Sequence, residues 1–462
     1  MNRKGIRYLA DIRRDEWAKV ALMHLFFFLV IMVFQILKPM KQGLFLEALG
    51  PRAAEWELIA KLLNIVVAVA AAAVFSYLAG HLRRTHLTAV FGLFFFVAFF
   101  LYSRMLASPP GALAIWTFYL LGDLFSTVMV AVFWAFLNDI SPPAQARRLY
   151  GVIGAGGVIG GYVGNTVVRE FVEAAGTDTL LHVCMGLTAV IMVLARAVDA
   201  RYLGKRRGSR PSRARQAGTE SAPSPAGSGS GWAQAVEGAR LVRRSGYLLC
   251  IAGLVGIYEI VSATINYQYS ATVVHLVGGA ADKQVFLATV GQVTGIVSIL
   301  SQILLTGFLL SRFGVGAALM LLPVAVLGSS LGFLLAPSLA MGAAMVVSSD
   351  GLNYSIYQTS KEVLYTPTSR AEKYKAKAFI DMFVQRFSKG IGIVISLAFA
   401  AITQYGAVRF LSLFVAALLA ALMFLIRYLA GAFERRTGAI EEAPITSADI
   451  RAQEPEGRES RV

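Results

Sequence analysis

Long apolar runs recur from one end of the chain to the other. Each covers about twenty residues, which lets a helix cross a hydrocarbon core roughly 30 Å thick. Lipid offers no partner for a free peptide group, and the runs are too long and continuous for the strands of a barrel. We therefore predict an all-α polytopic membrane protein. The twelve predicted spans cover residues 17–37, 58–79, 87–106, 111–137, 149–172, 177–199, 246–274, 285–310, 315–335, 339–360, 377–403 and 408–430.

Basic residues concentrate in alternate connections between these spans. The segments that carry them are residues 3–14, 81–86, 147–148, 201–244, 312, 370–377 and 435–436. The positive-inside rule places such segments in the cytoplasm, so we expect both termini to be cytoplasmic. One departure is the first predicted external loop, which holds Lys38, Lys41 and Arg52. We interpret this charge as serving an anionic solute.

A polar connection divides the spans into two groups of six. We predict an N-terminal half at 1–199, a cytoplasmic linker at 200–245, a C-terminal half at 246–433 and a disordered cytoplasmic tail at 434–462. The linker is rich in Pro, Ser, Gly and Arg, and 231–245 is expected to form a short basic helix at the inner membrane surface. Pro143 and Tyr150 recur at the same spacing as Pro367 and Tyr374, at equivalent places in the halves. This organisation is typical of a major facilitator transporter, with its binding site between the halves.

Composition adds few constraints beyond the membrane. The chain is 56% hydrophobic and only 15% charged, which excludes an ordinary soluble enzyme. The net charge of +16 lies largely in the predicted cytoplasmic loops, so topology and anionic lipid account for it, and we expect no nucleic-acid partner. Both cysteines lie in apolar runs, and His24 and His182 have no second ligand at metal spacing. We expect neither a cofactor nor a metal.

A few polar residues interrupt the predicted spans. A charged side chain there costs on the order of 2.5–3.5 kcal/mol on insertion scales, so each needs an explanation. We interpret the set as a central solute site in which lysines attract an anion and carboxylates pair with the lysines when the site is empty. The alternatives are fixed salt bridges between helices and lysines that snorkel to an interface. The candidate substrate-binding residues are Lys61, Asn64, Asp123, Glu259, Arg386 and Lys389.

Two further features, the glycine-rich stretch at 150–164 and Asp381, are expected to have structural roles and not to bind substrate. The glycine-rich stretch at 150–164 superficially resembles a nucleotide-binding loop, but it lies inside an apolar span and no Lys-Ser/Thr follows it. Close helix packing explains it better. Asp381 lies one turn from the predicted cytoplasmic end of its span, where we expect a structural tether.

Three stretches resemble the ATP/ADP translocases, the nucleotide transporter family of intracellular bacteria and plastids. They are KPMKQGLFLEALG at 38–50, FWAFLNDISPPAQARRLYGVIGAGGVIGG at 133–161 and KEVLYTPTSRAEKYKAKAFIDMFVQRFSKGIG at 361–392. The third is the most specific, with a lysine-rich loop that leads into Ala-x-Ile-Asp and then Lys-Gly. The resemblance implies a facilitator-like fold and exchange of ATP for ADP plus phosphate.

The resemblance also implies roles for individual residues. The family's second-span lysine falls on Lys61 and its fourth-span acid on Asp123. Its seventh-span glutamate falls on Glu259 and its eleventh-span lysine on Lys389. The chain departs from the family where Asp123 replaces the usual glutamate, where the first loop lacks an Arg/Lys-Asp pair, and where Trp-Lys is absent after the seventh-span acid.

We therefore predict a transporter that exchanges nucleotides of the ATP/ADP type, or related phosphorylated anions, by alternating access. The site is not expected to hydrolyse ATP, because the chain has no Walker motif. One alternative is a proton-coupled facilitator of another small solute, with Asp123 or Glu259 titrating during the cycle. Another is a membrane scaffold or receptor that does not transport. The expected location is the bacterial inner membrane, in contact with lipid, as a monomer.

Overall fold

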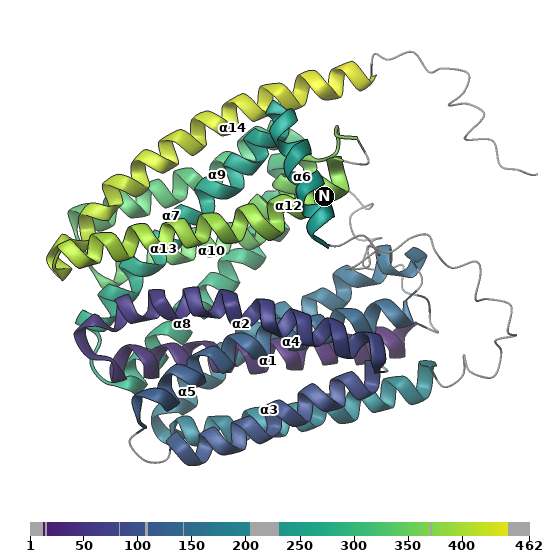
Figure 1. Cartoon of the computed structure of the whole chain (residues 1–462), viewed down its shortest axis with the longest axis vertical. Helices are drawn as coiled ribbons and strands as arrows, with labels where there is room; N and C mark the ends of the chain where they lie inside the picture. Colours follow the sequence, from purple (N-terminus) through teal and green to yellow (C-terminus); the bar gives the residue numbers. More distant parts are fainter. Residues whose placement is uncertain are drawn as a thin grey trace, which may run out of the picture.

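The computed structural model describes residue 13 and residues 16–82, 84–106, 110–141, 143–203, 231–369 and 372–441. Within these ranges the chain is almost entirely helical (Figure 1). The helices are α1 (Trp17–Ala48), α2 (Ala53–His81), α3 (Arg84–Leu106), α4 (Ala112–Ile140), α5 (Pro143–Val198), α6 (Gly231–Arg244), α7 (Gly246–Leu276), α8 (Ala280–Leu300), α9 (Gly307–Leu335), α10 (Leu339–Leu352), α11 (Gln358–Leu364), α12 (Lys377–Phe379), α13 (Gln385–Ile402) and α14 (Leu411–Glu441).

Nine helical segments in the described part of the chain are long and apolar enough to cross a membrane. Two of them, Leu149–Tyr202 and Ala280–Leu335, have 54 and 56 residues, about twice what one crossing needs. Each contains a glycine in the left-handed region, Gly176 with φ 79° and Gly314 with φ 79°. Glycine adopts this conformation without a steric penalty, so the chain can change direction there. The protein is a multi-pass membrane protein.

The buried side chains form two large hydrophobic cores. One core is built mainly from α1, α3, α4 and α5, and we call these helices with α2 the N-terminal bundle. The other is built mainly from α7 to α11 and α14, and we call α7 to α14 the C-terminal bundle. Figure 1 shows the N-terminal bundle in purple and blue, and the C-terminal bundle in teal, green and yellow.

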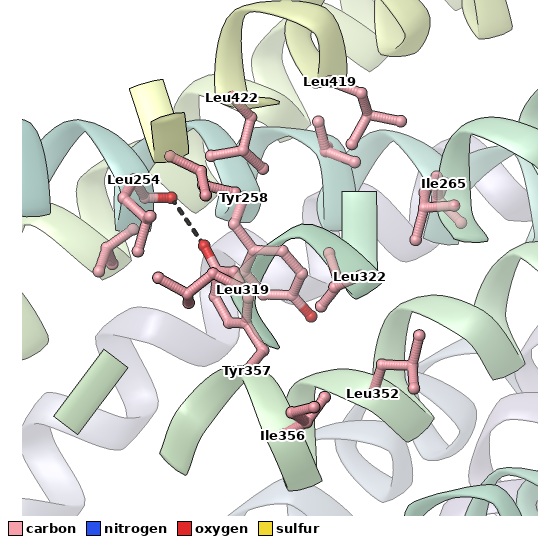
Figure 2. Packing of buried hydrophobic residues seen from close by; sticks show 14 of the residues in the cluster. Leu254, Tyr258, Ile265, Leu319, Leu322, Leu352, Ile356, Tyr357, Leu419 and Leu422 are labelled. Atoms are coloured by element: carbon pink, nitrogen blue, oxygen red, sulfur yellow. Dashed lines mark hydrogen bonds between the residues drawn. The ribbon is translucent and has the colours of Figure 1, made fainter. Parts of the chain in front are cut away.

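A tyrosine pair organises the C-terminal core. The hydroxyl of Tyr357 donates to the carbonyl oxygen of Leu254 at 3.2 Å, and the rings of Tyr357 and Tyr258 lie 5.2 Å apart (Figure 2). Tyr357 ends a π-helical segment, Asn353–Tyr357, between α10 and α11. A π-helical turn inserted in an α-helix often marks a functional site. Here the buried Tyr357 holds the wide turn in place.

The glycine-rich stretch packs α5 closely against α1, as the sequence analysis interpreted it. A Cβ added at Gly156, Gly160 or Gly164 would overlap a main-chain oxygen of α1, from His24, Phe28 or Met32 respectively. Backbone atoms cannot move aside as flexible side chains do. The three glycines therefore allow the two helices to approach one another this closely.

We expect Gly160→Ala to destabilise the protein by about 1–3 kcal/mol, because the added methyl group overpacks the contact with α1. Gly154 provides a matched control on the same helix, since no atom lies within 4 Å of a Cβ placed there. Gly154→Ala should leave stability unchanged or raise it by up to about 1 kcal/mol, because alanine is the better helix former. Thermal unfolding in detergent measures both. Equal melting temperatures for the two variants would contradict the packing explanation.

The linker contributes a helix to the C-terminal bundle. Helix α6 packs against α7, α12 and the π-helical segment Glu372–Ala376. Lys375 bridges to Glu237 of α6 at 2.6 Å, and a Cβ at Gly238 would overlap the carbonyl oxygen of Lys375. The predicted helix at 231–245 is therefore present and docked on protein. The prediction of a disordered tail from residue 434 is wrong for its first eight residues, because 434–441 form the last turns of α14. Residues 200–203 of the predicted linker end the π-helical segment Asp199–Leu203, and the remaining residues, 204–230 of the linker and 442–462 of the tail, lie outside the described residues.

Candidate functional site

A polar cavity of about 450 Å³ lies between the two bundles. Its walls come from α1, α2 and α4 on one side and from α7, α10 and α13 on the other. A cavity of this size is typical of small-molecule sites. Five of the six residues that the sequence analysis proposed for the site line it, namely Lys61, Asn64, Asp123, Arg386 and Lys389.

An ion pair forms one part of the N-terminal wall. Lys41 of α1 bridges to Asp123 of α4, and its ammonium lies 4.2 Å from the ring centre of Tyr119. The side chain of Lys41 is 5% exposed and that of Asp123 22% exposed. Desolvation makes a lone charge at such depth costly, so each partner stabilises the other.

A second acid connects this pair to Lys61. Glu57 is 1% exposed and lies one helical turn before Lys61 on α2, and their side chains are 3.1 Å apart. The same carboxylate oxygen of Glu57 accepts hydrogen bonds from the Tyr119 hydroxyl and from the Gln42 amide, each at 3.0 Å. The other oxygen has no hydrogen-bond partner among the described residues. Lys61 and Asp123 are thus both paired, but with partners that the sequence analysis did not assign.

Three further basic side chains line the cavity and differ from Lys41 and Lys61 in having no ion-pair partner among the described residues. Lys38, Arg386 and Lys389 are exposed to it, and none forms an ion pair within 4.0 Å in the described part of the chain. The lining contains five basic and three acidic side chains, the third acid being Asp350 of α10. The excess of two positive charges makes the cavity attractive to an anion, and guanidinium and ammonium groups suit phosphate in particular.

Glu259 lies beside the cavity. It is not among the residues that line it, its exposure is 8%, and one carboxylate oxygen accepts from the amide of Gln385 at 2.7 Å. Gln385 directly precedes Arg386 on α13. The structure therefore connects Glu259 to the cavity through α13, whereas the other five candidates line it directly. Asp381 bridges to Lys361 at 3.3 Å, which fits the tether that we expected for it.

The prediction that Lys38 and Lys41 lie in an external loop is wrong. Helix α1 continues through Pro39 to Ala48, so both lysines belong to a helix and face the cavity. The hydropathy pattern ended this span at residue 37 because the next turns carry two lysines and a proline. Asp123 of α4 compensates the charge of Lys41, and Lys38 faces the polar cavity. Hydropathy along the chain cannot register a partner or a cavity of this kind.

Glu57 and Asp350 were also missed. Glu57 lay one residue before the predicted second span, although its spacing of four from Lys61 was a usable signal. Asp350 stands inside a predicted span in the sequence SSDGLNY and carries the same cost that singled out the other charges.

The bundles are joined by polar contacts at one end. Lys283 of α8 bridges to Glu47 of α1 at 2.5 Å. Gln292 of α8 accepts from Arg169 at 2.8 Å and donates to Thr166 at 2.5 Å, both on α5. These contacts join the first two thirds of α8 to the C-terminal end of α1 and to α5.

The sequence profile of a family described as TLC ATP/ADP transporter matches residues 110–339 and 334–433. The chain is 23% identical over 448 residues to ADP,ATP carrier protein 1 of Chlamydia pneumoniae, covering 84% of this chain and 85% of that protein. It is 22% identical over 438 residues to the chloroplastic ADP,ATP carrier protein 2 of Arabidopsis thaliana, covering 82% and 68%.

Among solved structures, the fold is similar to that of a point mutant of the nucleoside transporter NupG. The TM-score is 0.60 at 14% identity, with 89% of this chain and 99% of that chain covered. At this identity the likeness concerns the fold alone.

Proposed function

The chain belongs to the TLC ATP/ADP transporter family, and from this and the cavity we infer that it exchanges nucleotides of the ATP/ADP type across a membrane. Relatives that share most of its length are ADP,ATP carriers. The family consists of transporters, so the protein moves its substrate without a chemical step. No cofactor enters this proposal.

The observation that carries the proposal is the trio Lys38, Arg386 and Lys389. These side chains are contributed by both bundles, face one cavity and lack ion-pair partners in the described chain. A phosphate chain would supply the missing negative charge. We propose that Lys61, Asn64 and Asp123 bind the solute from the N-terminal wall, opposite Arg386 and Lys389 of α13. Glu259 would orient α13 through Gln385.

Alternating access accounts for the arrangement of the bundles. We propose twelve spans in two six-span halves, at 1–199 and 246–433. Nine described segments can span, the two long ones would each span twice, and the broken helix from α10 to α11 would supply the twelfth. The polar contacts from α8 to α1 and α5 would close the outer side while the inner side is open.

The proposed setting is the bacterial inner membrane with both termini cytoplasmic. The basic connections support this orientation. We propose a monomer in contact with lipid and no nucleic-acid partner, with the segments at 200–245 and 434–462 as cytoplasmic linker and tail.

The test is counter-exchange in proteoliposomes. Purified protein is reconstituted into vesicles loaded with ADP, and uptake of radiolabelled ATP is compared with uptake into vesicles without nucleotide. We expect rapid uptake only into loaded vesicles. Uptake that follows an imposed pH gradient and ignores internal ADP would support proton coupling instead. Absence of nucleotide uptake by folded protein would refute the proposal.

A further inference from the structure

A second, smaller cavity of about 180 Å³ adjoins the central one. It lies between α1, α5, α7, α8 and the helix that continues from α10 into the segment Asn353–Tyr357. Five side chains line both cavities, so the two spaces share a border: Lys38, Gln42, Asn266, Asp350 and Tyr354. A ligand that crosses this border would place one part in each cavity.

The two cavities differ in charge. The smaller one is lined by one basic and one acidic side chain, Lys38 and Asp350, and both stand at the border. The central cavity has an excess of two positive charges. A polyanionic group is therefore favoured in the central cavity and gains no such advantage in the smaller one.

The smaller cavity is rich in tyrosines and side-chain amides. Tyr354 is 70% exposed and Tyr162 is 41% exposed, although both line the cavity. Their rings are thus available to a ligand that enters. Gln35 and Asn165 also line the space. Aromatic faces stack on nucleobases, and an amide offers the donor and acceptor pair that matches the edge of adenine.

A buried orphan group supports ligand binding here independently. Tyr269 lines the smaller cavity and is 4% exposed, yet its hydroxyl has no hydrogen-bond partner in the described structure. A buried hydroxyl without a partner destabilises a protein, so such groups are rare and call for an explanation. The hydroxyl is enclosed in this structure, so a polar edge of a bound base would satisfy it after a local movement of the cavity wall.

The position of Tyr354 is set by the C-terminal core. Tyr354 and Tyr357 belong to the same π-helical segment, and Tyr357 is locked in the core by its bond to Leu254 (Figure 2). Asp350 precedes Tyr354 by four residues, which places both on the cavity side of the helix. The ring of Tyr354 is therefore presented by a rigid element.

We propose that the smaller cavity is a nucleobase subsite that makes the transporter selective for adenine nucleotides. The base stacks on Tyr354 and its edge meets the Tyr269 hydroxyl and the amides, while the phosphates occupy the central cavity with Lys38, Arg386 and Lys389. The inference rests on the proposed function and adds the group that distinguishes a nucleotide from other phosphorylated anions.

The experiment compares ATP with inorganic tripolyphosphate, which has phosphates and no base. Each competes with radiolabelled ATP for purified wild-type protein, Tyr354→Ala, Tyr269→Phe and the control Tyr428→Ala. Tyr428 is 53% exposed on α14 and lines neither cavity. We expect ATP to bind wild type at least about tenfold more tightly than tripolyphosphate, since base stacking contributes on that scale.

In Tyr354→Ala the affinity for ATP should fall about tenfold while that for tripolyphosphate stays unchanged, and Tyr428→Ala should change neither. Tyr269→Phe keeps the ring and removes the hydroxyl, so it should lower the affinity for ATP and leave the affinity for tripolyphosphate unchanged. This variant still tests the subsite if Tyr354→Ala fails to fold. The proposed subsite is overturned if the wild-type protein binds ATP and tripolyphosphate with equal affinity, or if the variants lose affinity for both ligands equally. Either result leaves the proposal of nucleotide exchange standing. Failure of wild type to bind either ligand overturns the proposed function as well.

Discussion

Exchange of ATP for ADP is expected to fall more than about 100-fold when Arg386 and Lys389 are both replaced by glutamine. Both side chains are exposed to the central cavity and form no ion pair in the described chain, so their charge is available to substrate. A hydrogen bond to a charged group contributes about 1.5–3 kcal/mol, and two such losses account for this decrease. Initial rates of counter-exchange in proteoliposomes measure it.

The control for this experiment removes two charges elsewhere. Arg312 and Arg427 are exposed residues of the C-terminal bundle that line neither cavity. The double variant Arg312→Gln and Arg427→Gln should keep most of the exchange rate, because neither side chain faces the substrate and exposed charges contribute little to stability. Lys389→Arg should retain more exchange than Lys389→Gln, since the charge remains. A rate close to wild type in the Arg386 and Lys389 double variant would exclude these residues from substrate binding.

Lys41→Met is expected to destabilise the protein by about 3 kcal/mol, because it leaves Asp123 largely buried without its partner. Adding Asp123→Asn to the same chain should restore most of the loss, since no uncompensated charge then remains. Thermal unfolding of wild type, both single variants and the double variant in detergent forms the double-mutant cycle that isolates the pair.

The same cycle separates a structural from a transport role. If the double variant is stable but exchanges poorly, the pair also serves the solute. If it is as unstable as Lys41→Met, the two side chains are not coupled, contrary to the ion pair in the structure.

The membrane character of this protein follows from its sequence alone. Runs of about twenty apolar residues are helices in lipid whatever surrounds them, because every peptide group must find its partner within the segment. The glycine-rich stretch at 150–164 was interpretable for a related reason, since residues without side chains in an apolar helix favour close packing. The cost of burying charge also singled out Lys61, Asp123, Arg386 and Lys389 before any partner was visible.

The tertiary structure decided how these charges are paired. Lys41 lies 82 positions before Asp123 in the sequence, and no local pattern relates them. A lysine and a proline in succession ended the predicted first span, whereas partners on other helices allow α1 to continue to Ala48. The smaller cavity and the orphan hydroxyl of Tyr269 likewise exist only where five separate segments meet. The sequence alone determined that the chain is a helical membrane protein, because that depends on local hydropathy. The binding cavity depends on contacts between distant residues, which only the packed helices decide.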